Sequence, residues 1–342
     1  MSKKNIFNPP TPVENYFLNH SKLDFCYDPD EKIPVIQVNN FPNLGQLTAL
    51  RFLEWVQNNP EGVVSLPTGK TPEYFIRYAE HYLKHWEDKS TSAFLEEVGF
   101  DHSRKPRLQN LQFVQIDEFF PISPTQHNSF FDYVMKYYIN GFGISAERAQ
   151  LIDATQIILP QGKTYNEIFP DDVVDLSLRF SQPNTTKGRL QKEAIERIDE
   201  FCTDYERRIR EKGGLGFFLG GIGPDGHIAF NVRGSDYFST TRLTPTNFET
   251  QAAAAGDLGG IEVSQKRLVI TIGLQTISYN PDATCLIFAA GEAKAKIVAG
   301  SVQETANNAY PAGALHNMPN ARFYITSGAA VFLDRRQAHE IE

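Results

Sequence analysis

Short apolar runs alternate along this chain with longer stretches in which apolar residues recur at helical spacing. The runs with the length of a buried strand lie at 33–38, 63–66, 111–116, 215–219, 267–272, 284–289 and 320–325. The helical patterns lie at 44–55, 73–86, 128–139 and 191–210. Strands that alternate with helices favour a parallel sheet with helices on both faces. The pattern therefore predicts a three-layer α/β sandwich around a mostly parallel sheet.

Two stretches depart from this alternation. Residues 1–33 are polar and proline-rich without clear periodicity, which predicts an N-terminal extension on the surface of the domain. Residues 155–190 carry many proline and polar turn residues and little helical pattern, which predicts an inserted loop or subdomain. We therefore expect one α/β domain over residues 34–335, with an insertion at about 155–190.

The stretch 215–232, LGFFLGGIGPDGHIAFNV, joins an apolar run to a glycine-rich loop. Its glycines, Gly221 and Gly223 among them, let the backbone come close to a ligand. Asp225 and His227 lie in the same loop, and a carboxylate two residues from an imidazole can orient and polarise the ring. Because open α/β sheets bind ligands at the carboxyl ends of their strands, we interpret this stretch as an active-site loop.

Two other interpretations of the loop stay open. Residues 221–226 match the G-x-G-x-x-G pattern of dinucleotide-binding proteins by letter, but that pattern should open a helix. Pro224 removes a backbone donor and residues 231–234 soon break the run, so we expect no dinucleotide cofactor. The second alternative is a structural turn with a surface histidine.

The loop LPTGKTP at 66–72 separates an apolar run from a helical pattern. Free N–H groups and the helix dipole favour an anion at such a place. A nucleotide P-loop is excluded because Val64 stands where its first glycine is required. A phosphate-binding turn of another kind is the favoured interpretation, and a plain strand–helix turn is the alternative. The candidate phosphate ligands are Thr68, Gly69, Lys70 and Thr71, with Thr71 also the expected helix cap.

Three charged side chains follow other predicted strands. Asp117 and Glu118 come directly after the run at 111–116, where a partly desolvated carboxylate can move a proton at carbon. The alternative is that either one merely caps the next element. Lys294 lies in the first turn of the helix expected after 284–289. A cation there opposes the helix dipole, which an anionic ligand would explain.

Composition narrows the class of partner. The 342 residues carry a formal net charge of −8, so no global positive field draws the chain to nucleic acid or anionic lipid. Cys26, Cys202 and Cys285 show no metal-ligand spacing, and we expect reduced thiols and no metal site. The first residues lack the apolar core of a secretion signal, and no run approaches a membrane span. We therefore expect a cytoplasmic protein.

Four segments together resemble the glucosamine-6-phosphate deaminase family. The loop at 66–72 is similar to the LPTGGTP turn of that family, and IDEF at 116–119 is similar to its MDEY segment. GGIGPDGHIAFN at 220–231 resembles its GGxGxDGHIAFN loop, and GEAK at 291–294 its GxxK turn. The segments follow the family order over about 35–330. The related 6-phosphogluconolactonases share the general turn and a GxDGH loop, but they continue with Thr-Ala-Ser-Leu-Phe.

The resemblance implies a Rossmann-like fold and a metal-free aldose–ketose isomerisation coupled to loss of ammonia, with no cofactor. It implies that Asp117 is the base that moves a proton between C1 and C2 of the opened sugar. It also implies that His227, oriented by Asp225, helps to open the pyranose ring. The phosphate would lie between Lys294 and the turn at 68–71, and Glu118, Gly221 and Gly223 would contact the substrate. We expect a small phosphorylated sugar as ligand and a homo-oligomeric assembly.

Several positions depart from the family pattern. Val232 stands where the deaminases have the glutamate that completes a triad with the aspartate and histidine, and Phe119 replaces a tyrosine. Lys70 replaces the second glycine of the phosphate turn. The family's phosphate-binding arginine has no counterpart at 251–260, and Arg242 lies where relatives have an allosteric-site arginine. A carboxylate of the insertion could replace the missing glutamate, and the candidates are Glu167, Asp171 and Asp172.

Because of these departures, we consider three functions for the chain. The first is an isomerase-deaminase acting on an amino-sugar phosphate or a related sugar phosphate. The second is a sugar-phosphate lactonase, which needs His227 to activate water and needs no isomerising Asp117. The third is a sugar-phosphate sensor that binds its ligand without turnover.

Overall fold

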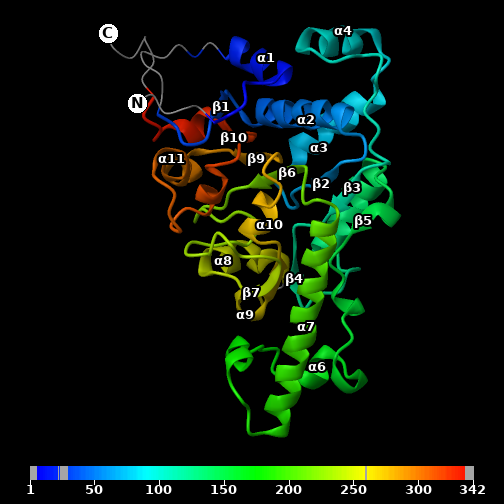
Figure 1. Ribbon diagram of the computed structural model, residues 1–342, viewed down its shortest axis with the longest axis vertical. Coiled ribbons are helices and arrows are strands. Elements are labelled where there is room, and N and C mark those ends of the chain that lie inside the picture. The colour runs from blue at the N-terminus through cyan, green and yellow to red at the C-terminus, as the bar shows by residue number, and fades with distance from the viewer. Residues whose placement is uncertain (1–5, 22, 24–29, 259, 336–342) are drawn as a thin grey trace.

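A seven-stranded sheet runs through the centre of the computed structural model, which describes residues 6–21, 23, 30–258 and 260–335 (Figure 1). The strand order is β1-β10-β9-β6-β2-β3-β5, and every pairing is parallel. The strands are β1 (Val35–Val38), β2 (Val63–Ser65), β3 (Gln112–Val114), β5 (Ala149–Gln150), β6 (Phe217–Gly221), β9 (Thr284–Ala289) and β10 (Ala321–Thr326). The predicted α/β fold with a mostly parallel sheet is confirmed.

Helices cover both faces of this sheet. On one face lie α2 (Phe41–Asn58) and α3 (Glu73–Lys84), and on the other lie α7 (Thr186–Glu211), α10 (Leu274–Ser278) and α11 (Ala295–Gln303). Alternate side chains of β6 enter the two cores, since Phe217 packs with the α2 side and Phe218 with the α7 side. Burial on both faces is why these strands read as continuous apolar runs.

A second, smaller sheet lies beside the first. Its antiparallel strands are β4 (Asp117–Phe120), β8 (Leu268–Thr271) and β7 (Arg242–Pro245), in the order β4-β8-β7. The apolar run at 267–272 thus belongs to this sheet and not to the parallel one. Hydropathy alone could not separate the two cases, because buried strands of both kinds read alike.

The remaining helices complete the layers and the edges. The long helical pattern at 128–139 forms two joined segments, an α-helix followed by a π-helix. The helices outside the two layers over the parallel sheet are α1 (Pro12–His20), α4 (Lys89–Val98), α5 (Phe130–Val134), η1 (Met135–Gly141), α6 (Tyr165–Ile168), α8 (Phe248–Leu258) and α9 (Ile261–Lys266). Among the described helices none is long and apolar enough to cross a membrane.

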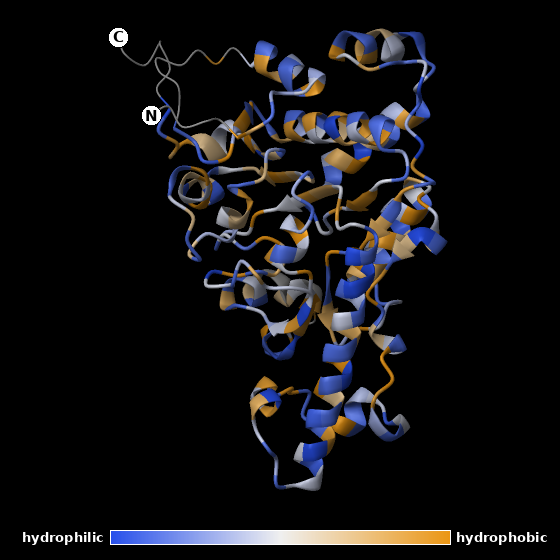
Figure 2. Cartoon of the chain, in the orientation of Figure 1, coloured by the Kyte–Doolittle hydropathy of each residue, from blue (hydrophilic) through white to orange (hydrophobic). Residues whose placement is uncertain are grey.

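The N-terminal residues and the 155–190 segment differ in how they join the domain. Helix α1 packs against α2 and α4, and the buried carboxylate of Glu14 accepts a hydrogen bond from Tyr324 of β10 (2.5 Å). The segment before α7 forms α6 and short 3-10 turns, and it projects from the body of the molecule beside the first half of α7 (Figure 1). Figure 2 shows polar residues over much of this projection and apolar ones along the central strands.

The order of the strands decides where a ligand site can lie. From β2 the chain moves outward to β3 and β5, and from β6 it moves the opposite way to β9 and β10. Because β2 and β6 are neighbours, the crossovers diverge between them, and such a switch point opens a crevice at the carboxyl ends of the strands. The loops after β2 and β6 are the two that the sequence marked for anion binding and for catalysis.

The cysteines take no part in this crevice. Cys202 and Cys285 are free and buried, and burial raises the pKa of both thiols, that of Cys202 to about 12. They are therefore inert core residues, as the sequence predicted. Cys26 lies outside the described residues.

Candidate active site

A pocket of about 980 Å³ occupies the switch point. Its wall is built from the loops after β2 and β6, from β4, from residues 127–137, from the first turn of α8 and from Lys294, which lies in the 3-10 turn before α11 and not within the helix. Of the residues selected from sequence it contains Thr68, Gly69, Lys70, Thr71, Asp117, Gly221, Gly223, His227 and Lys294. Tertiary structure thus brings together side chains that lie more than two hundred positions apart in the chain.

His227 and Asp225 form a hydrogen-bonded dyad at one side of the pocket. The His227 Nδ1 atom lies 2.6 Å from Asp225 Oδ1, which leaves the Nε2 atom for a ligand. Asp225 lies behind the wall. Burial alone raises its pKa, but hydrogen bonds from His227 and Asn247 outweigh burial and lower the pKa overall, so the carboxylate stays ionised. A carboxylate fixed on Nδ1 sets the ring for proton exchange at Nε2.

Gly223 is required by the close approach of the ring. A Cβ atom at this position would lie 2.2 Å from Cε1 of His227 and 2.3 Å from its Nδ1. Any side chain would therefore push the imidazole away from Asp225. On the other side, the ring of Phe230 lies nearly parallel to that of His227 at 5.8 Å. The loop holds the imidazole between these two contacts.

Asp117 begins β4 and faces the pocket. Only 7% of the residue is exposed, and its carboxylate has no hydrogen-bond partner among the described residues. Burial and the nearby Glu118 carboxylate raise its pKa well above the ordinary value. A desolvated carboxyl with a raised pKa is suited to take a proton from carbon and to return it.

Glu118 points to the opposite side of β4. Its carboxylate accepts backbone N–H bonds from Phe119 (2.9 Å), Phe130 (3.1 Å) and Phe131 (2.7 Å). Burial raises its pKa to about 7, although these bonds oppose the shift. The side chain lies outside the pocket wall and anchors the start of α5, in contrast to the substrate contact expected from sequence.

The anion end of the pocket combines the turn after β2 with Lys294. Gly69 has a φ of 88°, a left-handed conformation that favours glycine. The N-cap of α3 is Pro72 and no side chain caps the helix, so the expected cap by Thr71 is wrong. The N–H of Glu73 makes a long hydrogen bond to the Lys70 carbonyl (3.4 Å), and no side chain caps the other N–H groups of the first turn, which can serve a ligand. Lys294 lies opposite, half-buried, and burial lowers its pKa.

Known proteins resemble this chain over most of its length, although no family model matches it. The glucosamine-6-phosphate deaminase of Bacillus velezensis is 26% identical over 86% of this chain and 98% of that protein. The glucosamine-6-phosphate deaminase of Caenorhabditis elegans is 47% identical over 22% of this chain and 28% of that protein.

The structural comparisons agree. A monomeric glucosamine-6-phosphate deaminase superposes with a TM-score of 0.63 at 22% identity, covering 87% of this chain and 99% of that structure. A 6-phosphogluconolactonase from Leishmania guyanensis superposes with a TM-score of 0.56 at 16% identity, covering 90% and 99%. The chain is thus similar in sequence to glucosamine-6-phosphate deaminases over most of its length, and it shares its fold with both of these solved structures.

The pocket wall also contains residues that no sequence motif had marked. The aromatic helical pattern at 128–139, which predicts core more than site, contributes side chains to the pocket that include Phe130 and Tyr133. Arg77 of α3 contributes a guanidinium group to the wall. Glu249 and Thr250 line the pocket from the first turn of α8. Glu249 could have been found as the carboxylate in the first turn of the alanine-rich run at 248–258.

The carboxylates of the insertion do not reach this pocket. Glu167 bonds to Thr164 in a capping box at α6, and Asp171 pairs with Lys187. Asp172 lines a different cavity. The idea that one of them replaces the missing glutamate is therefore not supported by the structure. Val232 itself is half-buried and outside the pocket wall.

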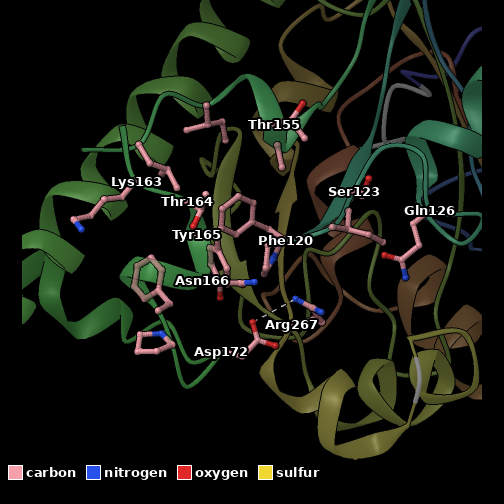
Figure 3. A pocket seen from close by; sticks show the side chains of 17 residues that line it. Phe120, Ser123, Gln126, Thr155, Lys163, Thr164, Tyr165, Asn166, Asp172 and Arg267 are labelled. Atoms are coloured by element: carbon pink, nitrogen blue, oxygen red, sulfur yellow. Dashed lines mark ion pairs between the residues drawn. The ribbon is translucent and has the colours of Figure 1, made fainter. Parts of the chain in front are cut away.

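The different cavity, of about 870 Å³, lies between the insertion and β4 (Figure 3). Phe120 and Tyr165 line it, and Asp172 lies 3.7 Å from Arg267 across it. Successive residues of β4 thus face different cavities, Phe119 the active-site pocket and Phe120 this one. Among the described residues, no cluster of three or more His, Cys, Asp or Glu side chains could hold a metal ion.

Proposed function

We propose that the protein is an isomerase-deaminase that converts an amino-sugar phosphate, glucosamine-6-phosphate or a close relative, to the ketose phosphate and ammonia. The observation that carries this proposal is the meeting of a buried acid, an Asp–His dyad and an anion site in one pocket. An aldose–ketose isomerisation needs these three groups. The full-length similarity to a glucosamine-6-phosphate deaminase supports the same reaction.

Each group has a task in the proposed reaction. The phosphate lies between the first turn of α3 and Lys294, where free N–H groups and a cation attract it. His227 exchanges a proton with the ring oxygen through Nε2 and thereby opens the pyranose, while Asp225 keeps the ring oriented. Asp117 then takes the proton from C2 and returns it to C1, after which water replaces the amino group as ammonia leaves.

Asp117 is suited to this task because it is protected from water. The proposal requires C1 and C2 of the sugar to lie against β4 when the phosphate is bound at the anion end, and Asp117 of β4 lines the same pocket. A raised pKa makes its conjugate acid a competent donor in the return step. A residue that only capped the next element would have no need to face the pocket.

The test is the release of ammonia and fructose-6-phosphate from glucosamine-6-phosphate by the purified protein. We expect turnover in the wild type and loss of it in Asp117→Asn and His227→Ala. Val232→Glu, which restores the residue of the relatives, serves as the matched variant. Absence of turnover in both the wild type and Val232→Glu would refute the deaminase proposal.

A second candidate is a sugar-phosphate lactonase. It is favoured by Val232, since a dyad without the glutamate can still activate a water molecule for attack on an ester carbonyl. Asp117→Asn separates the two candidates. The substitution abolishes an isomerase, because the proton at carbon has no acceptor, whereas a lactonase that uses His227 keeps most of its activity.

A further inference from the structure

Asn247, which no motif had marked, links the dyad to the wall of the pocket. It directly precedes α8 and is half-buried. Its Nδ2 atom donates a hydrogen bond to Asp225 Oδ2 at 2.5 Å. Its Oδ1 atom accepts the backbone N–H of Thr250, in the first turn of α8, at 3.0 Å. One side chain thus bonds to both the catalytic loop and the helix that faces it.

The chemistry of the two partners fixes the orientation of this amide. A carboxylate only accepts hydrogen bonds and a backbone N–H only donates them. The NH₂ group must therefore face Asp225 and the oxygen must face Thr250. A flipped amide would set oxygen against oxygen and donor against donor. Aspartate at position 247 could keep the bond to Thr250, but it would bring a second negative charge against Asp225.

Both oxygens of Asp225 are held in this arrangement. Oδ1 accepts from His227 and Oδ2 accepts from Asn247, so the carboxylate cannot turn about its bond to Cβ. The direction of the His227 ring depends on that carboxylate, and a displacement of about 1 Å in a catalytic group can lower a rate about a hundred-fold. Asn247 also fixes the turn that places Glu249 and Thr250 in the wall.

We propose that Asn247 is a positioning residue for the Asp225–His227 dyad in a chain that carries Val232 in place of the deaminase glutamate. The effect on turnover rests on the proposed function, whereas the effect on the dyad does not. An amide holds the carboxylate without exchanging protons. Asn247 lies 22 residues beyond Asp225, directly before α8. It therefore supplies from a separate segment a support for the dyad that the deaminases provide within one loop.

The informative variant is Asn247→Asp, because it keeps the helix cap, removes the donor to Asp225 and sets a second carboxylate against that oxygen. The titration of the dyad is followed through the ¹⁵N signals of the His227 ring in the substrate-free, full-length protein. We expect the apparent midpoint to rise by about one unit or more, since the added carboxylate stabilises the protonated dyad. In the same variant we expect kcat to fall about a hundred-fold with little change in KM.

Asn40 supplies the matched control. It is the N-cap of α2 and lies outside the pocket wall, and its side chain accepts the backbone N–H of Asn43 at 2.9 Å. Asn40→Asp should leave the dyad midpoint and kcat unchanged. Asn247→Ala and Asn40→Ala should both lower stability on thermal unfolding, because each removes one cap, and Asn247→Ala also removes the donor to Asp225. Only Asn247→Ala should lower kcat.

Two results would overturn the inference. One is a dyad midpoint in Asn247→Asp equal to that of the wild type. The other is a wild-type kcat in Asn247→Ala. A shifted midpoint in a protein that turns over no amino-sugar phosphate, the wild type included, would support the positioning role and refute the proposed deaminase activity, so the two failures remain distinguishable.

Discussion

Glu118→Gln removes a buried charge next to the proposed base and should change how stability depends on pH. In the folded protein the Glu118 carboxyl keeps its proton up to a pKa of about 7, against 4.5 for a free side chain. The folded state therefore binds more protons than the unfolded chain between these values. Its contribution to stability is fully present below pH 4.5 and is lost as the pH rises through 7.

The size of this contribution follows from the shift. A difference of about 2.5 units between folded and unfolded pKa values corresponds to about 3 kcal/mol of stability lost across the window. Glutamine titrates nowhere in this range, so the variant should lack that part of the pH dependence. In the variant an amide NH₂ group replaces Oε2 opposite the N–H of Phe131, so that two donors face each other. This lowers the free energy of unfolding by about 1–3 kcal/mol at acidic pH.

The assay is urea unfolding of the wild type and Glu118→Gln at intervals from pH 4.5 to 8. The exposed Glu61→Gln is the control for the loss of one charge and should follow the wild type. Because the Glu118 carboxylate also raises the pKa of Asp117, the acid limb of the activity profile should move to lower pH in Glu118→Gln. Parallel stability curves for wild type and variant across this range would refute the reasoning.

Three further predictions test other parts of the molecule. Lys294→Gln should raise KM for the sugar phosphate about ten-fold or more and weaken competition by inorganic phosphate, because the anion end loses its half-buried cation. Glu249→Gln should weaken binding of the amino-sugar phosphate and leave that of fructose-6-phosphate unchanged, as calorimetry can show, since only an ammonium needs this exposed carboxylate. Tyr324→Phe should lower the free energy of unfolding by about 1–3 kcal/mol in urea, because the buried Glu14 carboxylate loses a donor.

The local order of the chain was readable from sequence because each element depends on its own residues. Apolar runs such as that at 284–289 form strands in the structure. The glycine and proline residues at 220–226 end a strand and form the loop that carries Asp225 and His227. Side-chain type and spacing also selected the polar groups that carry the proposed chemistry, since groups that follow parallel strands meet at one edge of the sheet.

Only the tertiary structure decided which elements lie side by side. The pattern at 267–272 does not state whether the strand pairs with β9 or with β4, because strand pairing is settled by distant partners. Neighbours in the chain can also face opposite ways, as Asp117 faces the pocket while Glu118 anchors α5. The contact of Asn247 with Asp225 has no local signal at all. It exists because packing of α8 against the catalytic loop brings an amide to a carboxylate, and no periodicity in the sequence records that distance.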